Sequence, residues 1–149
     1  MAKKPSPKPS PLANLPAKSR YVSRGGDKLR GALDAFGVSA KGKICLDVGS
    51  STGGFTDCLL QDGAQRVYAV DVGYGLFDYT LRKDPRVNVL ERTNFRHIDL
   101  DLIIEQPALA VVDVSFISLD KIFPKIMDVL APEGEAVHIR AACCCPAHA

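Results

Sequence analysis

Residues 43–55, KICLDVGSSTGGF, decide the fold. The first part, KICLDV, is a compact apolar run with β-branched residues, which predicts a buried strand. Gly49 ends this run, and from Gly53 to Gln61 the apolar residues have helical spacing. A buried strand that passes through a glycine-rich turn into a helix is the basic unit of an α/β fold.

The same alternation of strand and helix continues along the chain. The expected strands are residues 43–48, 66–72, 86–92, 108–114 and 135–139, and the expected helices are residues 27–36, 53–61 and 119–130. Because each expected strand is apolar almost throughout, both faces of the sheet must be covered by helices. The sequence therefore predicts a doubly wound, mostly parallel α/β sheet.

Length and composition indicate one globular domain with tails. The chain has 149 residues, of which 46% are hydrophobic and 24% charged. This mixture excludes wholesale disorder, a collagen-like repeat and a coiled coil. No apolar run approaches the roughly 18 residues that a membrane span needs, so no membrane partner is expected.

Residues 1–20, MAKKPSPKPSPLANLPAKSR, are rich in Pro, Lys and Ser. They predict a disordered tail, because proline removes hydrogen-bond donors and the segment has no apolar periodicity. A transit peptide is the alternative, which the five prolines disfavour. The net charge of +2 is small, but residues 1–30 hold eight basic residues against Asp27 alone. An anionic partner is therefore expected at the N-terminal end.

The five cysteines do not predict a disulfide framework. Their number is odd, Cys143, Cys144 and Cys145 are adjacent, and the other two lie in apolar segments. This usage indicates a reducing, cytoplasmic location. No metal site is expected, since adjacent cysteines lack the spacing that favours a tetrahedral zinc site.

The turn after the first strand is a candidate ligand site. In open α/β sheets, ligands bind outside the carboxyl ends of the strands, and glycines allow the backbone to approach them closely. The candidate cofactor-binding residues are Asp47, Gly49, Ser50, Ser51, Thr52, Gly53, Gly54 and Phe55. The turn matches neither a dinucleotide fingerprint nor a phosphate loop. The alternative is a tight turn that binds nothing.

Two further strand ends extend this candidate site. Asp71 ends the second strand, where a carboxylate commonly accepts hydrogen bonds from ribose hydroxyls. The third strand leads into residues 91–94, and from there Asn94 is expected to reach an adenine edge. A solvated loop is the alternative for residues 91–94. Taken together, the glycine-rich turn and Asp71 predict a pocket for a nucleoside cofactor.

Lys28 and Asp113 are the candidates for substrate chemistry. Asp113 ends the fourth strand beside the cofactor loop, and Lys28 follows the turn Gly25-Gly26. A buried aspartate charge is costly unless it is paired, so Lys28 is its expected partner. The alternative for Lys28 is an ordinary solvated helix residue.

Five segments in order resemble the TlyA (hemolysin A) family of FtsJ-like RNA methyltransferases. They are YVSRGGDKLRGAL, CLDVGSSTGGFTDCLLQDGA, VYAVDVGYG, VLERTN and VVDVSFISL, and the likeness covers residues 21–139. The resemblance implies a class I methyltransferase fold, which is Rossmann-like, with S-adenosylmethionine as cofactor. It also implies 2′-O-methylation of ribose in ribosomal RNA, so ribosomal RNA or ribosomal subunits are the expected partners.

The resemblance also implies roles for single residues. The first Lys and the Asp of a Lys-Asp-Lys-Glu tetrad fall on Lys28 and Asp113, and the cofactor loop falls on residues 47–55. Asp71 falls on the cofactor ribose.

The chain departs from the family pattern at both ends. Family members usually begin with a small RNA-binding domain, where this chain has the Pro-rich tail. After residue 139 the likeness stops, before the tetrad's second Lys and Glu and the family's last two strands. We therefore expect a tail over residues 1–20, an incomplete FtsJ-like methyltransferase domain over residues 21–140 and a divergent tail over residues 141–149.

Two hypotheses follow from the resemblance and its limits. The first is an RNA 2′-O-methyltransferase that uses S-adenosylmethionine. The alternative is a noncatalytic remnant that binds this cofactor or RNA. A nicotinamide dehydrogenase is a further alternative, whereas membrane lysis has no supporting amphipathic segment. The sequence specifies neither the modified nucleotide nor the oligomeric state.

Overall fold

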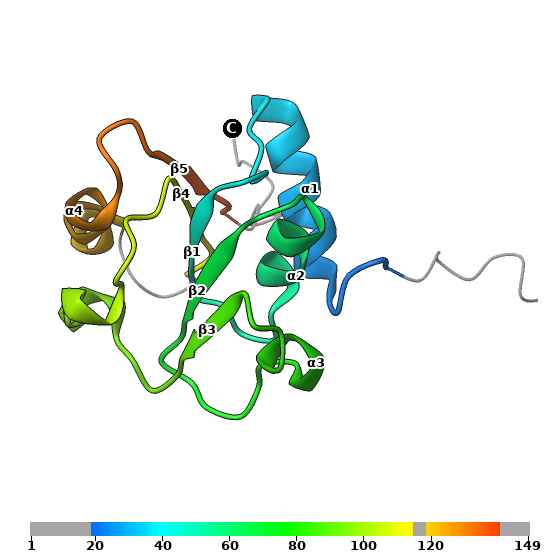
Figure 1. The fold of residues 1–149 in the computed structure, drawn as a ribbon, viewed down its shortest axis with the longest axis horizontal. Coiled ribbons are helices and arrows are strands. Elements are labelled where there is room, and N and C mark those ends of the chain that lie inside the picture. The colour runs from blue at the N-terminus through cyan, green and yellow to red at the C-terminus, as the bar shows by residue number, and fades with distance from the viewer. Residues whose placement is uncertain (1–18, 115–118, 141–149) are drawn as a thin grey trace, which may run out of the picture.

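The computed structural model describes residues 19–114 and 119–140 (Figure 1). The expected tails therefore lie outside the described residues, apart from Ser19 and Arg20. Within the described part, five parallel strands form one sheet in the order β3-β2-β1-β4-β5. The strands are β1 (Ile44–Val48), β2 (Arg66–Val70), β3 (Val87–Leu90), β4 (Leu109–Val112) and β5 (Glu135–His138).

Helices cover both faces of this sheet, as the predicted doubly wound architecture requires. The helices are α1 (Arg24–Phe36), α2 (Gly54–Gln61), α3 (Tyr79–Arg82) and α4 (Leu119–Val129), with 3-10 turns η2 (Phe95–His97) and η3 (Leu100–Leu102). Helices α1 and α2 lie on one face and α4 lies on the other, while α3 lies near the end of β3 (Figure 1). The α/β prediction is confirmed.

The apolar strands are explained by these two helix layers. In β1, Cys45 packs into the core beneath α1 and α2, whereas Leu46 and Val48 pack into the core beneath α4. All four residues of β4 are buried. A strand that is buried on both faces needs apolar side chains at successive positions, which is the pattern that the sequence shows.

Helix α1 begins three residues before the predicted start at Asp27, so its first turn includes Gly25 and Gly26. A Cβ atom on Gly26 would lie 2.4 Å from the Cβ of Tyr21, and only glycine therefore fits there. The predicted end of this helix at Phe36 is confirmed, and Gly37, which follows it, has the left-handed φ of 64° that favours glycine after a helix.

Helix α3 and the two 3-10 turns were not expected from the sequence. Each is only three or four residues long, and apolar periodicity is not visible over so short a span. The side chains of Asp78, Asn94 and Asp99 cap them by accepting hydrogen bonds from backbone N–H groups. These caps are the local signal that a search for apolar periodicity misses.

Candidate functional site

A cavity of about 260 Å³ lies at the carboxyl ends of β1, β2 and β4. Its walls come from the loops that follow β1, β2, β3 and β4, from the start of η2 and from α4. The lining residues are Val48, Gly49, Ser51, Val70, Asp71, Val72, Thr93, Asn94, Phe95, Asp113, Val114 and Ile122. This is the edge of a doubly wound sheet at which ligands bind.

The turn after β1 is held tightly against the neighbouring strands. The N–H groups of Gly49 and Ser50 both donate to the carbonyl oxygen of Val70, at 2.8 and 3.1 Å. Gly49 has a φ of 85°, and a Cβ atom there would lie 2.2 Å from the carbonyl oxygen of Asp113. Glycine at this position therefore brings the loops after β1 and β4 into direct contact.

Asp71 connects two loops of the cavity wall. One carboxylate oxygen, Oδ2, accepts from the N–H of Ser51 at 2.8 Å, and the other, Oδ1, accepts from the N–H of Gly73 at 2.7 Å. Ser51 has a φ of 49°, which is uncommon for a residue other than glycine. A carboxylate has about four lone-pair sites, so Asp71 retains the capacity to accept from a ligand.

Asp47 is fully buried beneath the turn and is not part of the cavity wall. Its Oδ2 accepts from the Thr56 hydroxyl at 2.7 Å, and Oδ1 has no partner among the described residues. The pKa of Asp47 is raised to about 7, mainly by burial, which outweighs the lowering by the Thr56 hydrogen bond. The neighbouring carboxylates of Asp113 and Asp71 contribute to the rise. The bond to Thr56 fixes the start of α2 on the end of β1.

The remaining predicted loop residues shape the turn and do not line the cavity. Ser50 is buried and its carbonyl accepts from the N–H of Gly53 at 2.8 Å, whereas Thr52 is exposed. A Cβ atom on Gly54 would lie 2.2 Å from Ser23 Oγ, so this glycine allows α1 to approach α2. Phe55 packs in the core on the α1 side of the sheet.

The loop after β3 contributes Thr93, Asn94 and Phe95 to the cavity. The Asn94 side chain accepts from the N–H of Arg96 at 3.0 Å, which leaves its amide N–H groups available as donors. The apolar lining residues, such as Val70, Val72 and Ile122, were not predicted as site residues. At strand ends and on a helix, their sequence signal is the same as that of ordinary core residues.

Asp113 lines the cavity and is half-buried, whereas Lys28 lies exposed on α1 and does not line it. The expected ion pair between Lys28 and Asp113 is absent, although the structure describes both residues. The physical reason is that partial exposure lets water solvate Asp113, so its charge needs no cation. The first turn of α1 nevertheless packs on Gly54 at the start of α2, and Lys28 directly follows this turn.

In the described residues, no cluster of three or more His, Cys, Asp or Glu side chains is arranged to hold a metal ion. Cys143, Cys144 and Cys145 lie outside those residues. No helix in the described ranges is long and apolar enough to cross a membrane.

A family model for FtsJ-like methyltransferases matches residues 21–143. The chain belongs to the FtsJ-like methyltransferase family. Within this family it is 49% identical over 117 residues to the 16S/23S rRNA (cytidine-2′-O)-methyltransferase TlyA of Mycobacterium tuberculosis, covering 78% of this chain and 44% of that protein. It is 51% identical over 112 residues to hemolysin A of Brachyspira hyodysenteriae, covering 74% of this chain and 47% of that protein.

The FtsJ-like chain also resembles solved structures. A hemolysin-like protein from Lactococcus lactis matches with a TM-score of 0.77 and 51% identity, over 81% of this chain and 59% of that one. An S-adenosylmethionine-dependent methyltransferase from Mesorhizobium loti matches with a TM-score of 0.61 at 19% identity, which establishes the Rossmann-like methyltransferase fold. The chain spans less than half the length of the curated relatives named above.

Proposed function

We propose that this FtsJ-like chain binds S-adenosylmethionine in the cavity and acts in methyl transfer to a ribose 2′-hydroxyl of ribosomal RNA. Residues 21–140 are the proposed methyltransferase unit, with the cytoplasm as its location. The observation that supports this best is the cavity itself, which has the Gly49 turn, Asp71 and Asp113 on its walls. Family membership supports the reaction class, and the activity named for the TlyA relative supports the substrate.

The residues of the cavity fit the parts of this cofactor. The free lone pairs of Asp71 suit the two ribose hydroxyls, and the polar groups of Thr93 and Asn94 suit the adenine edge. The cofactor supplies an electrophilic methyl group on a positively charged sulfur. The side chains of Asp71 and Asp113 both line the cavity, and these acidic groups favour a positive charge there.

The substrate side of the proposal assigns roles to Asp113 and Lys28. A ribose hydroxyl is a weak acid, so it needs a base or a cation that favours its deprotonated form. Asp113 lies on the cavity wall, where it would orient the hydroxyl toward the methyl group. The Lys28 ammonium, exposed on α1 just after the turn that packs on Gly54, would stabilise the developing negative charge.

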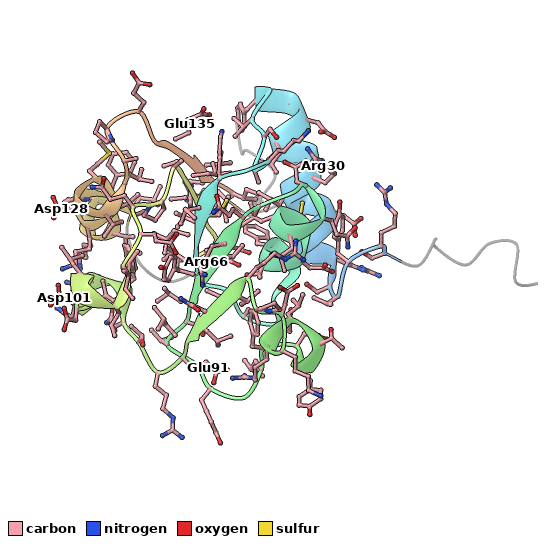
Figure 2. All side chains as sticks on the ribbon, viewed as in Figure 1. Arg30, Arg66, Glu91, Asp101, Asp128 and Glu135 are labelled. Carbon is pink, nitrogen blue, oxygen red and sulfur yellow. The ribbon has the colours of Figure 1, made fainter. Side chains whose placement is uncertain are left out.

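Cofactor binding is the first test. Titration calorimetry with S-adenosylmethionine should show binding to the wild-type chain. The Asp71→Ala variant should bind about 1.5–3 kcal/mol more weakly, the contribution of hydrogen bonds to a charged group. Asp101→Ala is the matched control, because Asp101 is exposed on η3, away from the cavity wall (Figure 2). Equal affinities for the wild type and Asp71→Ala would refute the assignment of the cavity.

Methyl transfer is the second test. Labelled methyl groups should pass from S-adenosylmethionine to ribosomal RNA or isolated subunits, and Asp113→Ala should lower the rate by roughly 100-fold or more, the scale of removing a catalytic group. Cofactor binding without any transfer would support the alternative of a noncatalytic binding protein. Binding of a nicotinamide nucleotide in place of S-adenosylmethionine would reject both.

A further inference from the structure

Large apolar side chains are exposed in the segment that follows β2. Val72, Tyr74 and Leu76 have exposed fractions of 64%, 67% and 62%. They come directly after Asp71, at the edge of the sheet where the cavity lies. Exposed apolar groups that gather next to a binding cavity indicate an interaction surface.

The Tyr74 ring is in contact with a cation from a distant part of the chain. The Arg92 guanidinium lies 4.2 Å from the ring centre, on the loop after β3. Arg92 has a φ of 50°, which is costly for a residue with a side chain, and its N–H donates to the Gly73 carbonyl at 3.0 Å. The backbone thus holds Arg92 in an unfavourable conformation that keeps it beside Tyr74.

A second pair of the same chemistry offers a comparison. The Lys83 ammonium lies 4.1 Å from the centre of the Tyr79 ring, and Tyr79 is also 67% exposed. These residues are four apart at helix α3, a spacing at which side chains meet on any helix surface. The Tyr79–Lys83 contact therefore needs no further explanation, whereas the Tyr74–Arg92 contact does.

Hydrogen bonds fix the loop that presents Tyr74. The N–H of Gly73 donates to Asp71 Oδ1 at 2.7 Å, and the N–H of Gly75 donates to Glu91 Oε1 at 3.2 Å. Glu91 also forms an ion pair with Arg82 at 2.6 Å and lies at the edge of the molecule below β3 (Figure 2). Among the described residues Arg92 forms no ion pair, so its charge is available to a ligand.

The pair also lies beside the opening of the cavity. Val72 both lines the cavity and is exposed, so the cavity reaches the surface at this residue, two positions before Tyr74. Thr93, next to Arg92, lines the cavity from the other loop. A ligand held by Tyr74 and Arg92 would therefore lie close to the proposed reaction site.

We propose that Tyr74 and Arg92 form a stacking site for an unpaired base of the substrate RNA beside the cavity opening. This inference rests on the proposed function and adds where the RNA strand binds. Every base can stack on an aromatic face, and an arginine can pair with the adjoining phosphate. One face of the Tyr74 ring contacts Arg92, and the high exposure of the ring leaves room for a base.

The test measures binding of a labelled single-stranded RNA of about 12 nucleotides to the full 149-residue chain by fluorescence anisotropy. Tyr74→Ala should raise Kd by roughly 5- to 150-fold, the range for loss of one base stack, whereas Tyr74→Phe should stay within about twofold because it keeps the ring. Tyr79→Ala is the matched control and should leave Kd unchanged. Arg92→Gln should reduce the salt dependence of binding. The negative slope of the logarithm of the association constant against the logarithm of the salt concentration should become less steep by about 0.7, whereas Tyr74→Ala should leave that slope unchanged.

Several outcomes would overturn the inference. Equal Kd values for the wild type and Tyr74→Ala would do so, as would equal losses in Tyr74→Ala and Tyr79→Ala. Calorimetry of the same variants with S-adenosylmethionine separates the inference from the proposed function: Tyr74→Ala should bind the cofactor like the wild type. A loss of cofactor affinity in Tyr74→Ala would assign the ring to the cofactor instead. A wild-type chain that binds RNA through Tyr74 but binds no cofactor would reject only the proposed function.

Discussion

The carboxyl group of Asp47 is buried, and in the described structure no cation forms an ion pair with it. Its pKa is about 7 in the fold against 3.8 for an ordinary aspartate, and burial is the main cause. The folded protein binds this proton more tightly than the unfolded chain does. The contribution of the protonated Asp47 to the free energy of unfolding is therefore fully present below about pH 4. It is lost as the pH rises through about 7.

This linkage gives a prediction for Asp47→Asn. The variant cannot ionise at this position, so its stability should not fall over this window, whereas the wild type should lose about 1.4 kcal/mol per pH unit between about pH 5 and 6. Chemical denaturation of both proteins at pH 5, 6, 7 and 8 measures the difference. Subtracting the stability of the variant from that of the wild type at each pH cancels the contribution of the other titrating acids. Parallel pH curves would mean that Asp47 is ionised throughout.

At the scale of single residues, the cavity lining was predictable where a glycine or a polar residue follows the end of a strand. Gly49, Ser51, Asp71, Asn94 and Asp113 were predicted and all line the cavity. Other residues in the same turn were predicted for the same reason but face elsewhere. Position 54 requires glycine because Ser23, the residue before α1, lies against it, and no local pattern shows which distant element a residue will meet.

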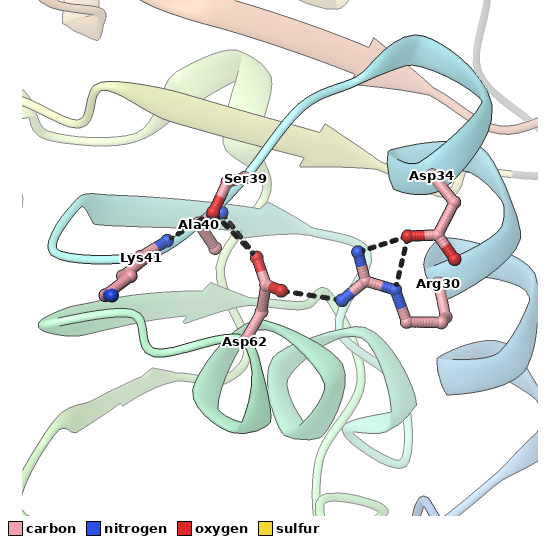
Figure 3. Close-up of polar contacts among 6 residues, drawn as sticks. All are labelled: Arg30, Asp34, Ser39, Ala40, Lys41 and Asp62. Atoms are coloured by element: carbon pink, nitrogen blue, oxygen red, sulfur yellow. Dashed lines mark hydrogen bonds and ion pairs between the residues drawn. The ribbon is translucent and has the colours of Figure 1, made fainter.

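At the scale of elements, α1, α2 and the loop before β1 are joined by one carboxylate. Asp62 accepts from Arg30 Nη1 at 2.7 Å and from the N–H of Ala40 at 2.6 Å (Figure 3). Burial raises the pKa of Asp62, but the hydrogen bonds from Ala40 and Arg30 outweigh it and hold this pKa below its usual value. Arg30 also pairs with Asp34, four residues along α1 and mostly exposed.

Substitutions of Asp62 and Asp34, the two partners of Arg30, should therefore lower the free energy of unfolding by different amounts. Asp62→Ala should lower the free energy of unfolding by about 1.5–3 kcal/mol, because it removes charge-assisted bonds between elements. Asp34→Ala should cost about 0.5 kcal/mol or less, as expected for an exposed pair within one helix. Urea denaturation measures both. Equal costs would mean that the junction between α1 and α2 does not depend on this carboxylate.

The elements could be predicted from the sequence where burial on both faces leaves a long apolar pattern. The expected strands matched β1 to β5 in order. Strand β1 ended at Val48 as expected, and the other four strands ended one or two residues earlier than expected. The surplus residues include Asp71 and Asp113, which belong to the cavity wall. The chain leaves the sheet there because the loops turn to form the site, and apolar periodicity does not record that turn.

For the whole molecule, the order of the strands predicts a gradient of local stability. Strand β1 is central, with β2 and β4 on its two sides, whereas β5 pairs with β4 alone among the described strands and its first two residues are exposed. Hydrogen exchange followed by mass spectrometry should therefore show the slowest exchange in residues 45–48 and faster exchange in residues 135–138. Slower exchange in residues 135–138 than in residues 45–48 would contradict this prediction, because it would show that β5 is better protected in solution than β1.

The central place of β1 has a further consequence during synthesis of the chain. Its neighbour β4 is made about 60 residues later, so one long edge of an apolar strand stays unpaired in the nascent protein until then. At roughly 5–20 residues per second, that interval lasts about 3 to 12 s. The speed of the ribosome over residues 49–108 thus sets how long a chaperone can engage β1 before the sheet closes around it.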